Sequence, residues 1–379
     1  MNKNIINQTG VGTNSPYFEN IDGLRAIAAF LVIFFHLCIW FQFPSTDGYN
    51  KLRFFLTFGW SGGELGVTFF FVLSGFLITY LAFNEQSKSQ TFNIPKFYVR
   101  RILRIWPLYY LTVIIGFIIY PLIVKLYGAV YVQEKASLLM YLLFLANFDH
   151  IYNNYPSSGI LGVQWSVCIE EQFYIIWPIF FSLFSRRKMF PFLVILIIIF
   201  SEYFYMYNSS FAIRYYHLFS SFRYLAFGGL LSYLCFFKNE WITFLLSKVN
   251  KFSTFLIYAI CFLLLLFKQR LLLYGVLNNV SYHLLVYFYF SFIIIEQNYS
   301  KNSFFKMGSF RILNWFGKIS YGLYLFHMIA IYVVLSLFNA NSSFVLWKIL
   351  LSILLSTFLS YFSYNYFESF FLKLKKNFQ

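Results

Sequence analysis

Two ionisable residues, Arg25 and His36, lie in the first long apolar run of the chain, DGLRAIAAFLVIFFHLCIW. In an α-helix, eleven steps of about 100° bring His36 to within roughly 20° of Arg25, on the same face and about 16 Å further along the axis. With Arg25 at a membrane surface, His36 lies near the bilayer middle, where an ionisable group usually faces a cavity or a partner. An imidazole there can act as a general base. A helix-capping arginine and a hydrogen-bonded core histidine explain the pair equally well.

A second pair of basic residues, Arg101 and Arg104, lies in the segment RRILRIWPLYY. The two residues are three positions apart, so they share one face of a helix. Paired arginines at a membrane surface can hold phosphates through charge-assisted, bidentate hydrogen bonds. The alternative is the positive charge that ordinarily flanks the cytoplasmic end of a membrane span.

Acidic and hydroxyl groups are combined in the segment QWSVCIEEQFY. Ser166, Glu170 and Tyr174 are spaced by four and line one helical stripe, next to Trp165. The favourable dipole at a helix N-terminus accounts for one acid of the Glu170-Glu171 pair. It does not account for the flanking tryptophan, serine, glutamine and tyrosine, so this segment is a candidate for binding or chemistry.

A second histidine lies in the late apolar segment GKISYGLYLFH. Ser320, Tyr324 and His327 share a helix face, and His327 lies about 12 Å from the start of that segment. That depth is comparable to the depth of His36. The two imidazoles could face one cavity, and His327 is equally consistent with a core histidine.

Three features have simpler structural explanations. Ser74 and Gly75, in FFFVLSGF, are small enough for another helix or a ligand to approach the backbone, and helix packing is the simpler of the two. Glu202 and Arg223 are intramembrane ionisable groups that could pair. The remaining histidines of interest, His150 and His283, are interpreted as loop or interface residues.

The composition determines the class of protein. Of the 379 residues, 60% are hydrophobic and 11% are charged, whereas a soluble domain carries about 25% charged residues. The chain is therefore predicted to be an all-α polytopic membrane protein with about ten transmembrane helices. The apolar runs are 24–41, 66–83, 108–126, 167–184, 190–207, 219–237, 252–267, 280–296, 319–338 and 344–366. The run 137–148 is too short to span.

The distribution of lysine and arginine sets the expected orientation. Basic clusters follow the even-numbered runs and the C-terminal end, so both termini are predicted to be cytoplasmic. Lys268 and Arg270 lie on the opposite side and depart from this pattern. The expected organisation is a cytoplasmic tail at 1–23, one transmembrane domain at 24–370 with an extracytoplasmic loop at about 127–166, and a basic tail at 371–379.

Several other classes are disfavoured. The net charge of +16 is explained by cytoplasmic loops, and no basic stripe outside them suggests nucleic-acid binding. The four cysteines have neither metal-binding spacing nor the pattern of a disulfide framework. The N-terminus lacks the features of a cleavable signal peptide. No metal is predicted.

Taken in order, IDGLRAIAAFLVIFFH, FFxxSGF, RxxRIxP, WSxxxEEQFY and SYGLYLFH resemble acyltransferase family 3 over about residues 20–370. The resemblance implies a multi-pass O-acyltransferase of the bacterial cytoplasmic membrane. Such an enzyme transfers an acyl group, acetyl by default, from cytoplasmic acyl-CoA to a hydroxyl of a cell-surface or lipid-linked glycan. Acetyl-CoA would be a co-substrate, with no permanently bound cofactor, and partners would include membrane lipid and cell-envelope polysaccharide machinery.

The resemblance also assigns roles to residues. It implies His36 as the catalytic base or acyl relay, Glu170 as a second catalytic group, and Arg25, Arg101 and Arg104 as binders of CoA. Further candidates for the substrate cavity, from the same motifs, are Ser74, Trp165, Ser166, Tyr174, Tyr324 and His327.

The chain departs from the family pattern where the last helix reads Glu368-Ser369-Phe370 in place of Glu-x-Pro-Phe, and Val167-Cys168 replace a Leu-Ser-like pair. Many relatives carry an extra extracytoplasmic esterase-like domain that is absent from this sequence. Two other functions are consistent with many spans and buried ionisable groups: a glycan or small-acid transporter, and a non-enzymatic partner in polysaccharide export. The acceptor and the oligomeric state are left open by the sequence.

Overall fold

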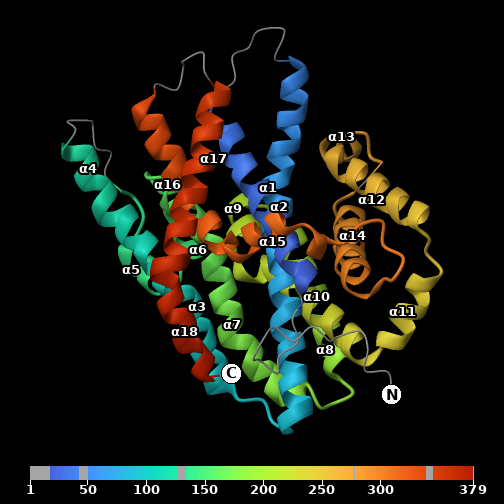
Figure 1. Ribbon diagram of the computed structural model, residues 1–379. Coiled ribbons are helices and arrows are strands. Elements are labelled where there is room, and N and C mark those ends of the chain that lie inside the picture. The colour runs from blue at the N-terminus through green and yellow to red at the C-terminus, as the bar shows by residue number, and fades with distance from the viewer. Residues whose placement is uncertain (1–17, 42–49, 127–133, 277, 339–344, 379) are drawn as a thin grey trace. The chain divides into compact units, whose positions relative to one another are not determined.

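A computed structural model describes residues 18–41, 50–126, 134–276, 278–338 and 345–378 (Figure 1). Every regular element in these ranges is helical. Among the described residues, eight helices are long and apolar enough to cross a membrane, or nine if one bent pair counts as a single span. The predicted class, an all-α polytopic membrane protein, is confirmed. Residues 127–133 of the predicted loop 127–166, and the first seventeen residues of the chain, fall outside the described ranges.

The long helices follow the predicted apolar runs. Their bounds are α1 (Glu19–Trp40), α2 (Asn50–Ser89), α3 (Ile94–Ile114), α7 (Gln164–Phe184), α8 (Phe190–Tyr207), α10 (Leu218–Phe237), α12 (Lys251–Leu266), α14 (Asn279–Tyr299), α16 (Ser320–Leu337) and α17 (Val345–Phe362). Shorter helices connect or extend them: α4 (Tyr120–Leu126), α5 (Leu138–Leu142), α6 (Ala146–Tyr152), α9 (Phe211–Tyr216), α11 (Asn239–Ser247), α13 (Lys268–Leu273), α15 (Arg311–Lys318) and α18 (Ser369–Lys375).

Two predicted runs are parts of longer helices. The run 108–126 is the second half of one helical stretch, in which a π-helical segment at Ile115–Ile119 joins α3 to α4. The run 344–366 continues through a π-helical segment at Ser363–Glu368 into α18. Hydropathy reports where a helix is apolar, whereas the helix itself extends into its polar flanks.

The segment predicted to be too short to span is broken into two short helices. α5 and α6 are separated at Phe144, which has a positive φ of 56°.

α11 and α12 form the bent pair, with 99° between them. The bend occurs where Asn250 caps α12 by accepting a hydrogen bond from the backbone N–H of Ser253.

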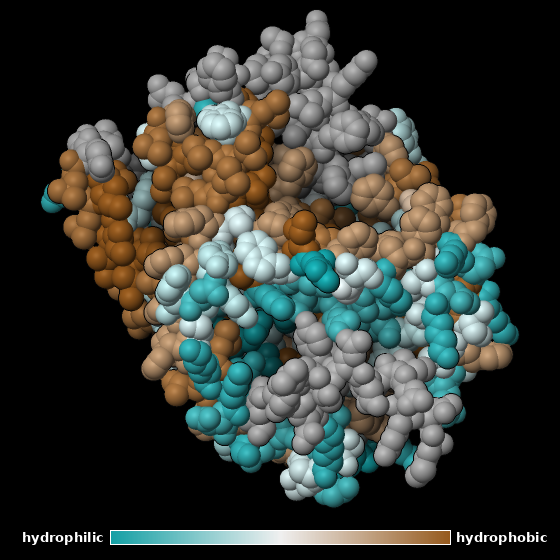
Figure 2. All heavy atoms as spheres, viewed as in Figure 1, coloured by the Kyte–Doolittle hydropathy of each residue, from teal (hydrophilic) through white to brown (hydrophobic). Residues whose placement is uncertain are grey.

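The chain divides into two compact units, each described here by itself. The first comprises residues 1–38, 45–90 and 224–318, and the second comprises residues 39–44, 91–223 and 319–379. In the second unit, hydrophobic residues cover the outward faces of α4 and of the α16–α17 pair (Figure 2). Exposed side chains such as Leu122 (56%) and Leu354 (56%) need an apolar solvent, which a lipid bilayer supplies.

In the first unit, α2 and α10 cross with their backbones in contact. A Cβ atom added at Gly75 would fall on the backbone of Leu225, and one added at Gly228 would lie 2.7 Å from the backbone nitrogen of Phe76. Only glycine fits both positions. The small residues of the FFFVLSGF segment therefore serve the close helix approach that the sequence predicts.

The start of α1 is fixed within the same unit by polar contacts. Asn20 donates to the carbonyl of Gln297 at 2.8 Å and accepts from the N–H of Gly308 at 2.8 Å. Lys306 donates to the carbonyls of Glu296 and Gln297 at 2.7 and 2.6 Å, which satisfies the C-terminal end of α14. These contacts hold the first turn of the helix that carries Arg25.

In the second unit, α16 and α17 pack along a stripe of small residues. Ser352, Ser356 and Ser360 are spaced by four and are buried. The hydroxyls of Ser356 and Ser360 donate to the carbonyls four residues earlier, at 2.7 and 2.6 Å. A Cβ atom added at Gly322 would lie 3.1 Å from the Cβ atom of Ser360, so the two helices are close here.

Candidate active site

Arg25 and His36 lie on one uninterrupted helix, α1, in the first unit. They therefore share a face and are separated by about 16 Å along the axis. His36 is half-buried, and its Nδ1 atom lies 2.9 Å from the carbonyl oxygen of Val32. Because a carbonyl only accepts hydrogen bonds, neutral His36 carries its hydrogen on Nδ1 and its lone pair on Nε2. That tautomer presents a base at the outer edge of the ring.

Arg101, Tyr174 and Glu170 form a contiguous group in the second unit. The guanidinium of Arg101 lies 5.7 Å from the centre of the Tyr174 ring and 5.4 Å from the ring of Phe97. Tyr174 donates its hydroxyl hydrogen to Glu170 Oε2 at 3.0 Å. One tyrosine thus contacts both a candidate phosphate binder and a candidate catalytic acid.

The antiparallel register of α3 against α7 explains the contact. Tyr98 of α3 donates to the carbonyl of Ile175 in α7 at 2.8 Å. Arg101, about one turn from Tyr98, therefore lies beside Tyr174, and Tyr174 is about one turn along α7 from Glu170.

Glu171 is a candidate functional residue to which the sequence assigned no role. Its side chain is 5% exposed, and its Oε2 atom accepts a hydrogen bond from Trp106 Nε1 at 2.8 Å. Its Oε1 atom is buried and has no hydrogen-bond partner among the described residues. A buried carboxylate oxygen without a donor is costly. The adjacent acids Glu170 and Glu171 mark this position in the sequence. Only the packing of α7 against α3 shows which of the two is buried.

Two more contacts tie this part of the second unit together. Tyr321 donates to the carbonyl of Ile105 at 2.9 Å and so fixes α16 against α3. Glu368, which is 8% exposed, accepts from the hydroxyl of Ser363 at 3.1 Å and interacts electrostatically with Arg104. The glutamate of the altered Glu-x-Pro-Phe sequence is therefore close enough to one candidate phosphate-binding arginine to interact with its charge.

The other candidates of the second unit meet where α7 begins. Ser166 Oγ lies 2.5 Å from the hydroxyl oxygen of Tyr324, and both atoms are within hydrogen-bonding distance of the carbonyl of Val163, at 3.3 and 3.1 Å. His327 is fully buried, and its Nδ1 atom lies 3.2 Å from the carbonyl of Leu323. Like His36, it carries its lone pair on Nε2 when neutral.

Trp165 lies beside this group and contacts α9. Its ring centre is 5.0 Å from that of Tyr215 and 5.1 Å from that of Tyr216. The last candidate, Ser74, is 8% exposed at the crossing of α2 and α10 in the first unit. The first unit thus holds Arg25, His36 and Ser74, and the second unit holds the remaining candidates.

His150 differs from its sequence-based interpretation. It lies in α6 rather than in a loop or at an interface, and it is 2% exposed. Its Nε2 atom lies 3.1 Å from the hydroxyl of Tyr141. The rings of Tyr216 and Tyr155 pack against it at 4.9 and 5.5 Å. Burial lowers the pKa of His150 from 6.5 to about 4. The packing of α6 against α9, more than sixty residues away in sequence, buries His150. The local sequence pattern could not predict this burial.

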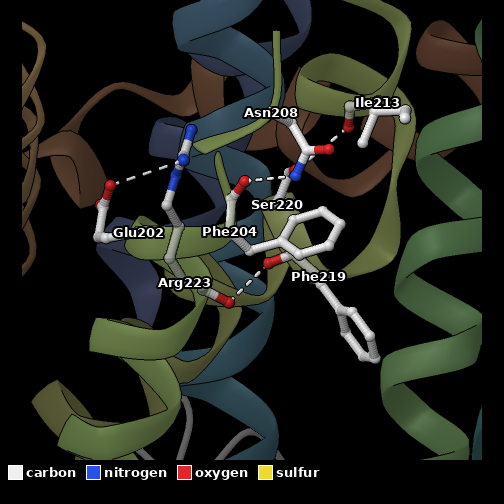
Figure 3. Close-up of polar contacts among 8 residues, drawn as sticks. Glu202, Phe204, Asn208, Ile213, Phe219, Ser220 and Arg223 are labelled. Atoms are coloured by element: carbon white, nitrogen blue, oxygen red, sulfur yellow. Dashed lines mark hydrogen bonds and ion pairs between the residues drawn. The ribbon is translucent and has the colours of Figure 1, made fainter. Parts of the chain in front are cut away.

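Two ion pairs account for charges that the sequence left open. Arg223 NH1 lies 3.6 Å from Glu202 Oε2, so the suggested pairing is confirmed (Figure 3). Lys268 Nζ lies 2.8 Å from Glu64 Oε2 and 4.0 Å from the centre of the Tyr282 ring. Lys268, one of the two basic residues that depart from the charge asymmetry, is therefore neutralised by an acid within its own unit.

A comparison with known protein families matches most of the chain, including both units. A family model described as an acyltransferase domain, that of acyltransferase family 3, matches residues 18–365. The chain belongs to acyltransferase family 3. The match spans both units and every candidate residue except Glu368, so the resemblance of the five motifs is confirmed.

Two relatives from this family illustrate the similarity. The chain is 32% identical over 190 residues to the peptidoglycan O-acetyltransferase OatA of Listeria monocytogenes, which covers 48% of this chain and 27% of the relative. It is 30% identical over 179 residues to the O-acetyltransferase OatA of Staphylococcus aureus, covering 45% of this chain and 26% of the relative. The matched region is thus about a quarter of the length of these relatives. No solved structure matches the chain.

Proposed function

We propose that this chain is an O-acyltransferase of the bacterial cytoplasmic membrane that transfers an acetyl group from cytoplasmic acetyl-CoA to a hydroxyl of a cell-envelope glycan. Its family membership supports acyl transfer, and the names of its relatives support acetyl as the group and a cell-wall glycan as the acceptor. The observation that carries the proposal is the 2.9 Å contact between His36 Nδ1 and the carbonyl of Val32, which favours a neutral ring with its lone pair on Nε2. His36 and Arg25 share one face of α1.

The proposed roles follow from the chemistry of the side chains. Arg25, Arg101 and Arg104 bind the phosphates of CoA, because guanidinium groups form charge-assisted bidentate bonds to phosphate. The distance of about 16 Å from Arg25 to His36 along α1 is of the order of an extended pantetheine arm. Glu170, whose Oε2 atom accepts a hydrogen bond from Tyr174, is the second proposed catalytic group.

The reaction balances without any redox partner. His36 Nε2 accepts the proton of the acceptor hydroxyl while the hydroxyl oxygen bonds to the thioester carbonyl carbon. The carbon–sulfur bond then breaks, and the thiolate of CoA takes the proton back from the imidazolium. In the relay form of this mechanism, Nε2 attacks the thioester carbon and the CoA thiolate leaves. The acceptor hydroxyl then attacks the acetyl carbon, Nε2 leaves, and the hydroxyl proton passes to the thiolate.

The experiment is transfer of radiolabelled acetyl from acetyl-CoA to glycan in membranes that contain the full chain. We expect His36→Ala to lower the rate by a factor of roughly a hundred or more, the usual contribution of a positioned base. His283→Ala is the matched control, since it removes a buried imidazole of the same unit outside the proposed site. Rates are divided by the amount of inserted protein. Acetyl transfer by His36→Ala at the wild-type rate would contradict the proposal. Transport of glycan by the wild-type chain without acetyl transfer would also contradict it.

A further inference from the structure

The corner between α8 and α10 in the second unit is fixed by side-chain hydrogen bonds. Asn208 donates to the carbonyl of Phe204 at 2.7 Å, and Ser220 donates to the carbonyl of Ile213 at 3.1 Å (Figure 3). Ser201 donates to the carbonyl of Phe219 at 2.6 Å, and Ser210 caps α9. The corner is a built structure, able to hold charged side chains in fixed positions.

This corner holds an excess of positive charge. The guanidinium of Arg223, a residue that is 4% exposed, lies 3.8 Å from the centre of the Tyr205 ring and pairs with Glu202. The guanidinium of Arg214 lies 5.9 Å from the centre of the same ring. Two guanidinium groups therefore lie beside the same tyrosine ring. The ion pair with Glu202 neutralises only one of them, Arg223.

The half-buried Arg214 has one guanidinium nitrogen without an acceptor. Its Nε atom is buried and has no hydrogen-bond partner among the residues that the structure describes. No ion pair to Arg214 occurs within the same residues. A second cation beside the buried Arg223 is unfavourable unless an anion neutralises it. The position is suited to a carboxylate or a phosphate.

Aromatic rings continue from this corner to the start of α7. Phe211 is stacked on Tyr215 with ring centres 5.5 Å apart and is 67% exposed. Tyr215 in turn contacts Trp165, whose neighbour Ser166 contacts Tyr324. The flat apolar faces of sugar rings pack on aromatic side chains, and binding sites combine such surfaces with a few placed polar groups.

We infer that Arg214 and Arg223 form an anion site for the acceptor, which is a sugar that carries a carboxylate or a phosphate. This inference rests on the proposed function and specifies the charge of its substrate. The guanidinium groups bind the anionic group, and the rings of Trp165, Tyr215 and Phe211 contact the sugar. By the charge asymmetry of the loops, this end of the second unit is the expected extracytoplasmic side, where a surface glycan is available.

The test uses the full chain in vesicles of zwitterionic lipid and four acceptors of one amino-sugar oligosaccharide. These are the carboxylate, its carboxamide, the 1-phosphate and the unsubstituted sugar. Binding is measured calorimetrically without acetyl-CoA, and acetyl transfer is measured separately. We expect the two anionic sugars to bind at least about tenfold more tightly than the neutral ones, since hydrogen bonds to charged groups contribute that much. The stronger of the two identifies the anionic group.

Arg214→Gln is expected to remove this preference, to raise the KM for the anionic acceptors about tenfold and to leave the KM for acetyl-CoA unchanged. Arg214→Lys should restore part of it. Arg186→Gln, at an exposed position between α7 and α8, is the matched control. Because loss of Arg223 alone would strand Glu202, the second variant is the double substitution Glu202→Gln, Arg223→Gln, with the same expected loss of preference.

The outcomes separate the two proposals. Anion-selective binding without acetyl transfer would retain this site and reject the proposed function. Acetyl transfer with equal affinity for charged and neutral sugars, in the wild-type chain, would reject this site and retain the proposed function. An effect of Arg214→Gln that occurs only in vesicles containing phosphatidylglycerol would assign the arginines to lipid headgroups and also reject the site.

Discussion

The indole Nε1 of Trp106 donates a hydrogen bond to Glu171 Oε2 at 2.8 Å, across the contact between α3 and α7. The indole N–H is the donor that the described structure supplies to this carboxylate. The other carboxylate oxygen is buried without a partner among the described residues. The bond from Trp106 to Glu171 is therefore among the buried polar contacts that couple the helices of the RxxR and WSxxxEEQFY motifs.

Trp106→Phe tests the value of this contact. The substitution keeps an aromatic ring but removes the donor, so both oxygens of Glu171 become unsatisfied in a buried place. We expect a loss of about 1–3 kcal/mol in the free energy of unfolding, measured by thermal or denaturant unfolding in detergent. Trp241→Phe, at a residue of α11 that is 57% exposed, should change stability by less than about 0.5 kcal/mol. Equal effects would show that the indole bond is not special.

Gly75→Ala tests the crossing of α2 and α10. The new Cβ would overlap the backbone of Leu225, which cannot rotate away as a side chain can. We expect destabilisation by about 1–3 kcal/mol or more, seen as a lower midpoint in size-exclusion-based melting.

Gly62→Ala in the same helix is the matched control for that crossing. Its Cβ would meet Leu31 at 3.4 Å, an ordinary contact, so the gain in helix propensity, up to about 1 kcal/mol, should dominate. If Gly62→Ala and Gly75→Ala lower the melting midpoint equally, the close backbone approach is contradicted.

Arg101→Gln tests the binding of CoA. Loss of the guanidinium should raise the KM for acetyl-CoA by about tenfold or more, with a smaller change in kcat, because a charge-assisted contact to phosphate is removed. The neighbouring Arg100 donates to the carbonyl of Phe378 at 3.0 Å, so Arg100→Gln should leave that KM unchanged. Equal KM values for the two variants would argue against the assignment.

The buried imidazole of His150 predicts a pH dependence of stability. Its folded pKa is about 4, below the ordinary 6.5, so the unfolded segment binds the proton more tightly. At pH above 6.5 the residue is neutral in both states and costs nothing. As the pH falls from 6.5 toward 4, stability is lost, by up to about 3 kcal/mol. Asp149 beside it, whose pKa is raised by burial, acts with the opposite sign at lower pH.

Proteolysis or hydrogen exchange of residues 134–163 between pH 7 and pH 4.5 measures this effect. The wild-type segment should become less protected with acid, and His150→Gln should reduce the slope. A wild-type segment whose protection is constant over that range would contradict the assignment.

Much of the framework follows from sequence because its signals are local. The spacing of Arg25 and His36 on one helix and the pairing of Glu202 with Arg223 require only helical periodicity and the cost of charge in an apolar segment. The close approach at Gly75 follows from residue size.

What sequence could not provide depends on contacts between distant segments. Glu171 and Glu170 are neighbours in the chain, and only the position of Trp106 distinguishes the buried one. Lys268 looks like an exception to charge asymmetry until Glu64, about 200 positions earlier, is found beside it. The helical extent of residues 94–107 was underestimated because arginines form helices well while lowering hydropathy.

The serine stripe of α17 bears on how the chain is assembled in the membrane. Because Ser356 and Ser360 donate to carbonyls of their own helix, these hydroxyls need no partner from α16 when α17 first enters lipid. Insertion of α17 can therefore precede its pairing with α16, as in two-stage assembly. The small side chains then allow the later approach, so the same residues that make the helix soluble in lipid also prepare the surface on which its neighbour docks.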